Sequence, residues 1–378
     1  MKKDINEGVF PEETLLKLRI FAECFREWFP VFLYSPFVHS IRIYDFFAGS
    51  GQDALGNKGS PLILLDEAKG NNRQYCGANN KEVIFHFNEG DRQKVSNLRT
   101  NAGDFLANCS EANCKSQCRY SEPVITGTDF KEMFSDAVFQ SVLRNEKIAK
   151  FILLDQYGYS QVDEDIFKRL ISSPMTDFIF FVSSSFIRRF KDHPSTKKYV
   201  ETHKIPFNAE HPRECHRQMA DYYQSLIPSG REYYIHNFTI KKGSNYWGLI
   251  FGSSHTFGME KFLKVCWGID VHSGESNFNI DKDWEVGTLF HQPEISNKKQ
   301  QIKDEVRKMI LSGEINDNIA GFKCVLRKRG LPILFTEVVK ELEKAGQISR
   351  TGELNYTSTG IHKAKEYRIH LQPKEGVK

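Results

Sequence analysis

The spacing of hydrophobic positions changes along the first half of the chain. Over residues 14–33, apolar side chains recur every three or four positions, which predicts an amphipathic helix with an aromatic face packed in a core. Segments with helical spacing, for example 91–106 and 163–171, alternate with short, almost continuously apolar runs. Such runs are typical of strands buried on both faces of a parallel α/β sheet. The predicted strands lie within 41–51 and at 83–87, 124–126, 150–154 and 177–182.

The pattern changes in the second half of the chain. Two runs, 233–241 and 246–252, are close enough to form an antiparallel hairpin through residues 242–245, which would end the sheet. After a polar stretch at 292–301, residues 332–345 have helical spacing, and Gly346 is placed to end that helix. Two short strands, at 347–349 and 367–371, are expected to follow.

Short helices followed by a two-stranded flap describe a winged helix. We therefore expect two domains. The first covers residues 1–290 and consists of a parallel sheet with a terminal hairpin, an N-terminal helix and a cysteine-containing insertion at 66–122. The second is a winged-helix-like domain at 299–378.

Composition supports two globular domains. The 378 residues are 40% hydrophobic, 26% charged and 13% aromatic, which argues against a disordered, collagen-like or coiled-coil chain. The N-terminus lacks the apolar stretch of a signal peptide, and no window has the roughly 20 apolar residues of a membrane span. We expect a soluble cytoplasmic protein whose eight cysteines need no disulfide framework.

Positive charge is concentrated at the end of the chain. Residues 299–378 contain 16 Lys and Arg against 10 Asp and Glu, although the net charge of the whole chain is only +4. This excess of +6 belongs to the predicted winged-helix-like domain. It favours a polyanionic partner for that domain.

A glycine pair lies where the first strand of the predicted sheet ends. Gly49 and Gly51 let a ligand approach the backbone where a side chain would block it. Glu89, just beyond the second strand, is placed to bind ribose hydroxyls. The spacing from Gly49 to Ala54 also satisfies the loose fingerprint of dinucleotide-binding proteins, so a nicotinamide-dependent enzyme is one alternative.

Two further features favour S-adenosylmethionine over a nicotinamide dinucleotide. Asp45 precedes the glycine pair by four residues, where a carboxylate can hold the ammonium of the ligand. Asp129 and Phe130 follow the third strand, where an acid can accept from the adenine amino group and an aromatic ring can pack on the base. The alternative is that Asp45 and Glu89 are ordinary carboxylates at strand ends.

The fourth predicted strand runs into the segment Leu154-Asp-Gln-Tyr-Gly-Tyr159. In amino-group methyltransferases, this place carries an Asp/Asn-Pro-Pro-aromatic loop that accepts hydrogen bonds from the target amino nitrogen and stacks the target base. Here Asp155 and the carbonyl of Gln156 can accept, and Tyr157 or Tyr159 can stack. Because Gln and Tyr replace the two prolines, the rigidity of the loop and the target atom stay open. A structural cap is the alternative role of Asp155.

These segments make the chain similar to the three-Cys-motif partner protein family. The matching segments are YDFFAGSG (44–51), GSPL (59–62), LDQYGY (154–159), HR (216–217) with YY (222–223), and FGMEKF (257–262). The resemblance covers most of residues 14–285. It implies a bacterial protein with a class I methyltransferase-like domain and a winged-helix-like region. It also implies a partner protein with three cysteines in an iron–sulfur-like pattern. Phe47, in the first segment, joins the candidate cofactor-binding residues.

A group of cysteines in the predicted insertion is a weaker candidate site. Three thiols lie within ten residues, and a fourth precedes them in the same insertion: Cys109, Cys114 and Cys118, with Cys76. They are a possible zinc site, although their spacing misses the usual two-residue intervals. Plain thiols of an insertion loop are the alternative.

Basic residues gather in two places. One group follows the fifth strand, near the predicted entry of a methyl acceptor, and comprises Arg188, Arg189, Lys191, Lys197 and Lys198. The other precedes the predicted recognition helix of the tail and comprises Lys323, Arg327, Lys328 and Arg329. Both groups suit contacts with phosphates of nucleic acid, and a solvated loop is the alternative for the first.

The sequence thus leads to one function and one alternative. We expect an S-adenosylmethionine-dependent methyltransferase that acts on nucleic acid or on a nucleic-acid-associated factor, together with a three-Cys-motif partner. The alternative is a methyltransferase-like module that binds nucleic acid or its partner without turnover, for example in defence against mobile elements.

Overall fold

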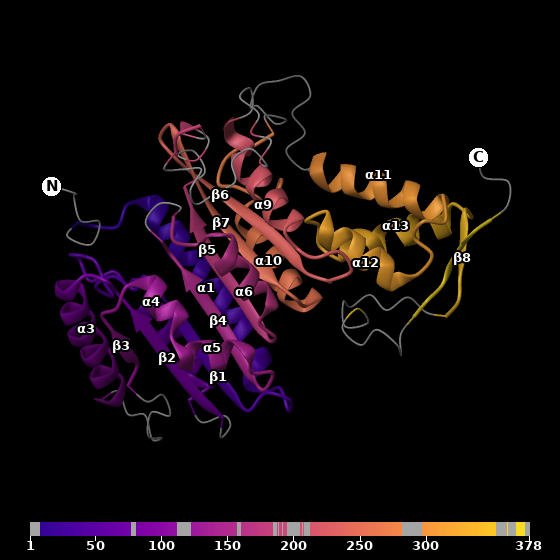
Figure 1. The fold of residues 1–378 in the computed structure, drawn as a ribbon. Coiled ribbons are helices and arrows are strands. Elements are labelled where there is room, and N and C mark those ends of the chain that lie inside the picture. Colours follow the sequence, from indigo (N-terminus) through magenta and orange to yellow (C-terminus); the bar gives the residue numbers. More distant parts are fainter. Residues whose placement is uncertain are drawn as a thin grey trace. The chain divides into compact units, whose positions relative to one another are not determined.

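In the computed structural model, the apolar runs form one seven-stranded sheet in the order β3-β2-β1-β4-β5-β7-β6 (Figure 1). The first five strands pair in parallel, and β7 is antiparallel to both β5 and β6. This confirms the predicted class I methyltransferase-like fold, a mostly parallel sheet that ends in a hairpin. The strands are β1 (Ser40–Asp45), β2 (Glu82–Asn88), β3 (Val124–Thr126), β4 (Ile148–Leu154), β5 (Thr176–Val182), β6 (Tyr234–Lys242) and β7 (Asn245–Ser253).

The chain divides into two units, Met1–Ser254 and His255–Lys378. This division comes earlier than the predicted end of the first domain at residue 290. None of the helices among the described residues is long and apolar enough to cross a membrane. The structure describes residues 8–76, 81–111, 122–156, 160–183, 187, 189–190, 192–194, 205, 207, 212–281, 297–352, 361 and 368–374.

Helices cover both faces of the sheet in the first unit. On one face, Phe25 and Trp28 of α1 pack against Phe151 of β4, with ring centroids 5.3 and 5.1 Å apart. Helix α2 packs on α1 and on α3. The other face carries α4, α5, α6 and α9. The helices are α1 (Glu12–Leu33), α2 (Ser60–Glu67), α3 (Arg92–Glu111), α4 (Phe130–Ser135), α5 (Ala137–Arg144), α6 (Glu164–Ser172) and α9 (Cys215–Ser225).

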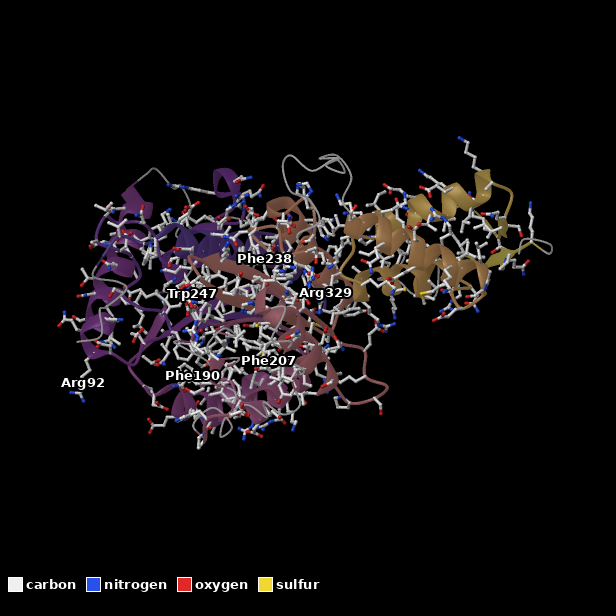
Figure 2. The ribbon with its side chains drawn as sticks, turned by 90° about the horizontal axis from the view of Figure 1, so that it is seen from above. Arg92, Phe190, Phe207, Phe238, Trp247 and Arg329 are labelled. Carbon is white, nitrogen blue, oxygen red and sulfur yellow. The ribbon has the colours of Figure 1, made fainter. Side chains whose placement is uncertain are left out.

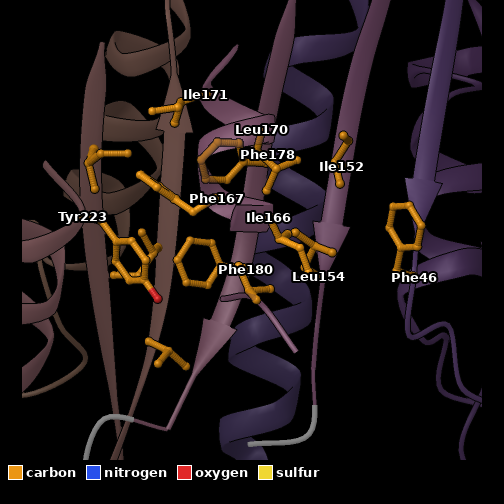
Figure 3. Close-up of a cluster of buried hydrophobic side chains, with 14 of the residues drawn as sticks. Phe46, Ile152, Leu154, Ile166, Phe167, Leu170, Ile171, Phe178, Phe180 and Tyr223 are labelled. Carbon is orange, nitrogen blue, oxygen red and sulfur yellow. The ribbon is translucent and has the colours of Figure 1, made fainter. Parts of the chain in front are cut away.

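Aromatic and aliphatic side chains fill the space between the sheet and this second layer of helices (Figure 3). Phe167 of α6 lies 4.8 Å from Tyr223 of α9, and Tyr223 meets the edge of Phe180 in β5 at 4.9 Å. Burying side chains of this size stabilises a fold by about 1.5–3 kcal/mol each. The core thus holds the strand ends that carry the candidate site in fixed positions.

Lys150 of β4 is a fully buried lysine on the same face. Its Nζ donates to the carbonyl oxygens of Val142 and Leu143, both at 3.3 Å, and of Asn145, at 2.8 Å. These carbonyls lie at the C-terminal end of α5, where backbone acceptors lack partners within the helix. Burial lowers the pKa of Lys150 to about 8. Lys150 therefore caps α5 and fastens it to the sheet.

The second unit contains four helices and a two-stranded sheet among its described residues. They are α10 (Thr256–Ile269), α11 (Asn297–Leu311), α12 (Asn318–Arg327), α13 (Ile333–Lys344), β8 (Ile348–Arg350) and β9 (Leu371–Pro373). Strands β8 and β9 are antiparallel, and Asp317 forms a further antiparallel bridge with His370. Three helices followed by paired strands agree with the expected element order of the tail. Its function as a winged helix stays a prediction.

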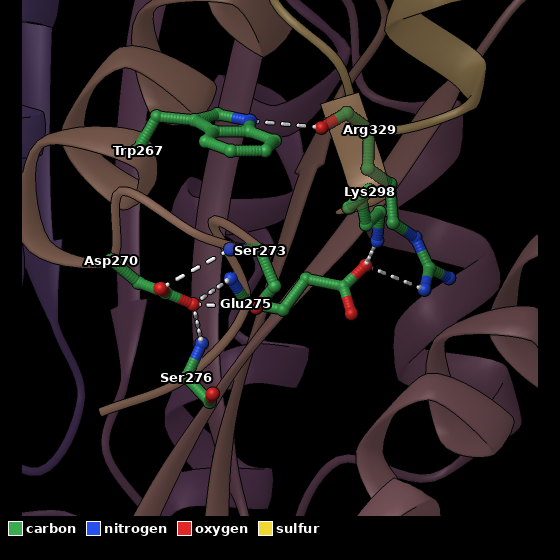
Figure 4. A network of polar contacts seen from close by, with 7 residues as sticks. All are labelled: Trp267, Asp270, Ser273, Glu275, Ser276, Lys298 and Arg329. Carbon is green, nitrogen blue, oxygen red and sulfur yellow. Dashed lines mark hydrogen bonds and ion pairs between the residues drawn. The ribbon is translucent and has the colours of Figure 1, made fainter. Parts of the chain in front are cut away.

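A polar network explains why α10 belongs to the second unit (Figure 4). Nε1 of Trp267 donates to the carbonyl of Arg329, 3.0 Å away. The fully buried carboxylate of Glu275 pairs with Lys298 and, at 3.5 Å, with Arg329. Asp270 accepts backbone N–H bonds from the loop that contains Glu275. These bonds join α10 and its following loop to α11 and to the end of α12.

Candidate active site

The order of the strands reverses between β1 and β4. From β1 the chain builds β2 and β3 on one side, and it then crosses to β4 on the other side. In open α/β sheets, ligands bind in the crevice that such a reversal leaves at the carboxyl ends of the strands. Asp45 is the last residue of β1, opposite Leu153 of β4, and Asp155 follows two residues after Leu153. The topology therefore places Asp45 and Asp155 at one crevice.

The glycine loop after β1 adopts a backbone conformation that other residues rarely take. The φ angles of Gly49 and Gly51 are 62° and 84°, in the left-handed region that glycine enters without steric cost. A Cβ on Gly51 would lie 2.9 Å from Cδ1 of Leu98 in α3. The N–H of Gly59 donates to the carbonyl of Gly51 over 2.7 Å. Both glycines are thus required by the turn and its packing, whether or not a ligand is bound.

Asp45 is a buried carboxylate with an open hydrogen-bonding position. Its side chain is 1% exposed, and Oδ1 accepts the N–H of Phe47 over 3.1 Å. Oδ2 has no hydrogen-bond partner within the described residues. Burial raises the pKa of Asp45 to about 7, and the nearby carboxylates of Asp155 and Glu89 add to the shift, while the Ser60 hydroxyl opposes it. A cation at Oδ2 would relieve both the burial and the repulsion.

Glu89 joins the glycine loop to the start of α3. Its Oε2 accepts the N–H of Gly49 and its Oε1 accepts the N–H of Asp91, each over 2.9 Å. The N–H of Glu89 is itself held by the carbonyl of Thr126 in β3. Each carboxylate oxygen has more than one lone pair. Glu89 therefore orders the loop and can still accept hydroxyls of a ligand, its predicted role.

Asp129 and Phe130 have structural roles after β3. Oδ1 of Asp129 caps α4 by accepting the N–H groups of Lys131 and Glu132. Phe130 is 4% exposed, and its ring lies 5.4 Å from Phe46 and 5.0 Å from the half-buried Phe47. The structure therefore places Phe130 in the aromatic core beneath the crevice. Its predicted contact with adenine is limited to the small part of the ring that stays exposed.

Lys17 of α1 contacts the candidate site, although no motif in the sequence predicts it. Its Nζ forms an ion pair with Oδ2 of Asp155, and the two side chains are 16% and 17% exposed. The same ammonium lies 5.4 Å from the centre of the Phe181 ring at the end of β5. The candidate acceptor aspartate is thus held by a residue 138 positions earlier in the sequence.

Gln156 fixes the backbone after β4 through its side chain. Nε2 donates to the carbonyl of Phe181 over 2.9 Å, and Oε1 accepts the N–H groups of Gln161 and Val162 over 2.9 and 3.2 Å. The side chain is 2% exposed. These bonds tie Gln156 to the end of β5 and to the backbone of Gln161 and Val162. The predicted acceptor on Gln156 is its backbone carbonyl, which the side-chain bonds do not use. Tyr157 and Tyr159 lie outside the described residues.

The candidate nucleic-acid residues differ in how their charges are paired. Arg189 is exposed and donates to Oδ1 of Asn245 over 3.2 Å. In the tail, Lys328 pairs with Glu305 of α11, and Arg329 with Glu275. Arg327 is exposed and forms no ion pair with the described residues, and Lys323 is partly buried. Arg188, Lys191, Lys197 and Lys198 lie outside the described residues.

The proposed zinc ligands can be placed only in part. Cys76 is buried, with 3% of its surface exposed. Cys109 belongs to the last turns of α3, and Cys114 and Cys118 lie outside the described residues. Within the described part of the chain, no group of three or more His, Cys, Asp or Glu side chains could hold a metal ion.

Comparison with solved structures finds methyltransferases. The chain is 11% identical to the human methyltransferase 10 domain containing protein, covering 62% of this chain and 82% of that one, with a TM-score of 0.29. It is 10% identical to Trm1 from Pyrococcus horikoshii in complex with S-adenosyl-L-methionine, covering 67% of this chain and 58% of that one, with a TM-score of 0.37. It thus spans less than two thirds of Trm1.

An O-methyltransferase from Bacillus cereus in complex with SAH is 14% identical, covering 61% of this chain and 79% of that one, with a TM-score of 0.31. Identities this low concern the fold alone. No protein-family model and no curated protein sequence matches the chain.

Proposed function

We propose that the chain is an S-adenosylmethionine-dependent methyltransferase that acts on an amino group of nucleic acid or of a nucleic-acid-associated factor. The observation that carries this proposal is Asp45, a buried carboxylate at the crevice where the strand order reverses, with one oxygen that has no partner among the described residues. Two further carboxylates, Asp155 and Glu89, act on it electrostatically. Such a site suits a ligand that carries positive charge, as this cofactor does.

The residues present fit the parts of this cofactor. Oδ2 of Asp45 would accept from its ammonium, Glu89 would accept from ribose hydroxyls, and the backbone of Gly49 and Gly51 would line its path. The cofactor supplies a methyl group bound to a positively charged sulfur. A nicotinamide dinucleotide has neither this ammonium nor the sulfonium, and its diphosphate would bring negative charge toward three carboxylates.

The residues after β4 support transfer to an amino group. Lys17 contacts Oδ2 of Asp155. Oδ1 makes no hydrogen bond within the described residues and is left to accept from a ligand. Oδ1 and the carbonyl of Gln156 would accept hydrogen bonds from the two N–H groups of an amino group and so direct its lone pair at the methyl carbon. The C–N bond would form as the C–S bond breaks with its electron pair going to sulfur, and the surplus proton on nitrogen would pass to solvent. Orientation of this kind supplies a large part of the rate in reactions that need no strong base.

Nucleic acid and a three-Cys-motif partner are the proposed associates of the reaction. The basic excess of residues 299–378 and the exposed side chains of Arg189 and Arg327 support a polyanionic acceptor. The resemblance of segments 44–51 and 154–159 to the partner-protein family supports the second associate. The residues assigned to the cofactor all belong to this chain, so cofactor binding and the two associates are tested separately.

The first experiment is a calorimetric titration of the full chain with S-adenosylmethionine and with its demethylated product. Wild type should bind both, and mass spectrometry of freshly purified protein should detect the carried ligand. Arg19→Met changes an exposed side chain of α1 and serves as the control variant, which should bind both ligands as wild type does. Absence of heat and of a thermal shift at millimolar ligand would contradict the cofactor assignment.

The second experiment measures transfer of a radiolabelled methyl group. Total RNA, total DNA and protein extract from a strain lacking the gene serve as acceptors, each with and without the partner protein. Label should accumulate in one fraction and depend on Asp155. If the protein binds the cofactor but transfers label to no fraction, the enzymatic interpretation is wrong and a binding module without turnover is favoured.

A further inference from the structure

Lys17 occupies a position on α1 where an apolar side chain is expected. It lies four residues before Phe21, seven before Cys24 and eleven before Trp28, so all four share one stripe of the helix. The other three are buried, with exposures of 0%, 5% and 5%. A lysine at the end of such a stripe loses hydration. Its location therefore calls for a specific partner.

The partner is the candidate acceptor aspartate. Nζ of Lys17 bonds Oδ2 of Asp155 and lies over the ring of Phe181, which is 9% exposed. The carbonyl of Phe181 also accepts from the side chain of Gln156. Lys17 and Phe181 thus restrain the two adjacent residues, Asp155 and Gln156, from α1 and from β5.

Lys242, which lies near the same end of α1, pairs with Glu13 and not with Asp155. Nζ of Lys242, at the end of β6, lies 3.8 Å from Oε2 of Glu13 and 4.6 Å from the ring centre of Trp247, which Figure 2 labels. Within the described residues, Lys17 is the cation that contacts Asp155. Removal of Lys17 would leave this carboxylate beside Asp45 with no compensating charge, an arrangement that is costly at low exposure.

We propose that Lys17 is the positioning residue of Asp155: it holds Oδ2 and so presents Oδ1 to the amino group of the acceptor. This inference rests on the proposed function and adds to it a residue from the first helix. Lys17 touches neither the acceptor nor the cofactor in this role. Its removal should therefore lower kcat and leave cofactor affinity almost unchanged.

The test compares Lys17→Met, Lys17→Arg, Asp155→Asn and the double variant Lys17→Met/Asp155→Asn in the full chain. The assay is labelled methyl transfer to the fraction that wild type modifies, with the cofactor Kd measured by calorimetry. Lys17→Met should lower kcat by about 100-fold, as expected for a small misplacement of a reacting group. Its cofactor Kd should stay within about threefold of wild type. Lys17→Arg should recover most of the rate.

The double variant separates positioning from a general structural role. If Lys17 acts through Asp155, the double variant should be no slower than Asp155→Asn, because the two changes remove one interaction. Full additivity, an unchanged kcat in Lys17→Met, or a loss of cofactor affinity equal to the loss of kcat would each overturn the inference.

Arg19→Met is the control for changes to α1. A wild type that transfers no methyl group contradicts the proposed function itself, and the inference falls with it. An active Lys17→Met variant contradicts the inference alone.

Discussion

Charges are balanced in opposite ways in the crevice of the first unit and on the helices of the second. At the crevice, Lys17 pairs with Asp155, while Asp155 and Glu89 both raise the pKa of the nearby carboxylate of Asp45. Oδ2 of Asp45 has no hydrogen-bond partner in the part of the chain that the structure describes. The crevice thus gathers three carboxylates, of which the buried Asp45 is hard to ionise without a nearby cation.

On the surface of the second unit, opposite charges pair with each other. Nζ of Lys303 in α11 lies 2.6 Å from Glu341 and 3.5 Å from Glu337, both in α13. Arg307 bonds the other oxygen of Glu341 at 2.5 Å. The bond from Lys303 lowers the pKa of Glu341. These ion pairs join two helices, whereas Oδ2 of Asp45 at the crevice has no hydrogen-bond partner among the described residues.

Replacing the acceptor aspartate should have the largest effect. Asp155→Ala removes the oxygen that orients the amino group, so methyl transfer should fall by about 1,000-fold or more, since transfer depends on orientation. Cofactor affinity should stay within a few-fold of wild type, because Asp155 is not the residue assigned to the ammonium. Labelled transfer and calorimetry on the same preparation measure both. An equal loss in both quantities would place Asp155 in the cofactor site instead.

Asp45→Asn should chiefly weaken cofactor binding. Loss of a charged hydrogen bond costs about 1.5–3 kcal/mol, which corresponds to a Kd about 10–150 times higher. The carboxylate of Asp45 has a pKa of about 7 and must be ionised to bind the ammonium. Wild-type affinity should therefore rise between pH 5 and pH 7, and the variant should show a flat profile there. A sloping profile in the variant would assign the titration to another group.

The same shift predicts a stability difference in the absence of ligand. The pKa of Asp45 is higher in the folded protein, at about 7, than the value of about 3.9 in an unfolded chain. The folded state then binds the proton more tightly, so stability is lost as pH rises from about 4 to 7. Thermal unfolding of ligand-free wild type should show this decline. The decline should be smaller in Asp45→Asn.

A smaller effect is expected at the tail. Arg327 is exposed and has no ion-pair partner among the described residues, whereas Lys328 pairs with Glu305. If the tail contacts phosphates, Arg327→Ala should reduce the salt dependence of nucleic-acid binding by about one unit of slope. Lys328→Ala should change it less. Fluorescence anisotropy of the full chain at several salt concentrations measures both slopes. Equal slopes in both variants and wild type would favour a protein partner for the tail.

The smallest effect should come from the paired surface charges. Lys303→Met breaks two ion pairs with glutamates whose side chains are 45% exposed. Exposed pairs contribute roughly 0–1 kcal/mol, so the free energy of unfolding should fall by less than about 1 kcal/mol. Urea unfolding followed by circular dichroism checks this. A larger loss would show that charges on α11 and α13 also support the core of the second unit.

The fold could be predicted to a large extent because its signals are local. Each of the five apolar runs in the first half contains a strand, and the hairpin turn lies at residues 242–245, as expected. The division between the units was harder to locate. It depends on bonds such as Trp267 to Arg329 and Lys298 to Glu275, which join residues far apart in the sequence. Periodicity contains no information on such pairs.

The candidate site shows the same limit. The positions of Asp45 and Asp155 follow from strand ends, which the apolar runs locate. Lys17 is 138 residues from Asp155, and its only sequence signal is a cation within an apolar helical stripe. Phe130 illustrates a different difficulty, because an aromatic residue after an acid suits either an adenine contact or a core. Only the packing of Phe130 against Phe46 distinguishes the two.

The reactivity of the buried amine of Lys150 can report how often α5 separates from the sheet. While α5 is packed on the sheet, Nζ of Lys150 donates to three carbonyl oxygens and the lysine side chain is inaccessible to solvent. An acylating reagent can therefore react at Lys150 only when α5 and β4 separate. Lys168, whose side chain is 55% exposed, is labelled without such separation and sets the reference rate. The ratio of the two rates, followed by peptide mapping, measures how often this part of the molecule opens.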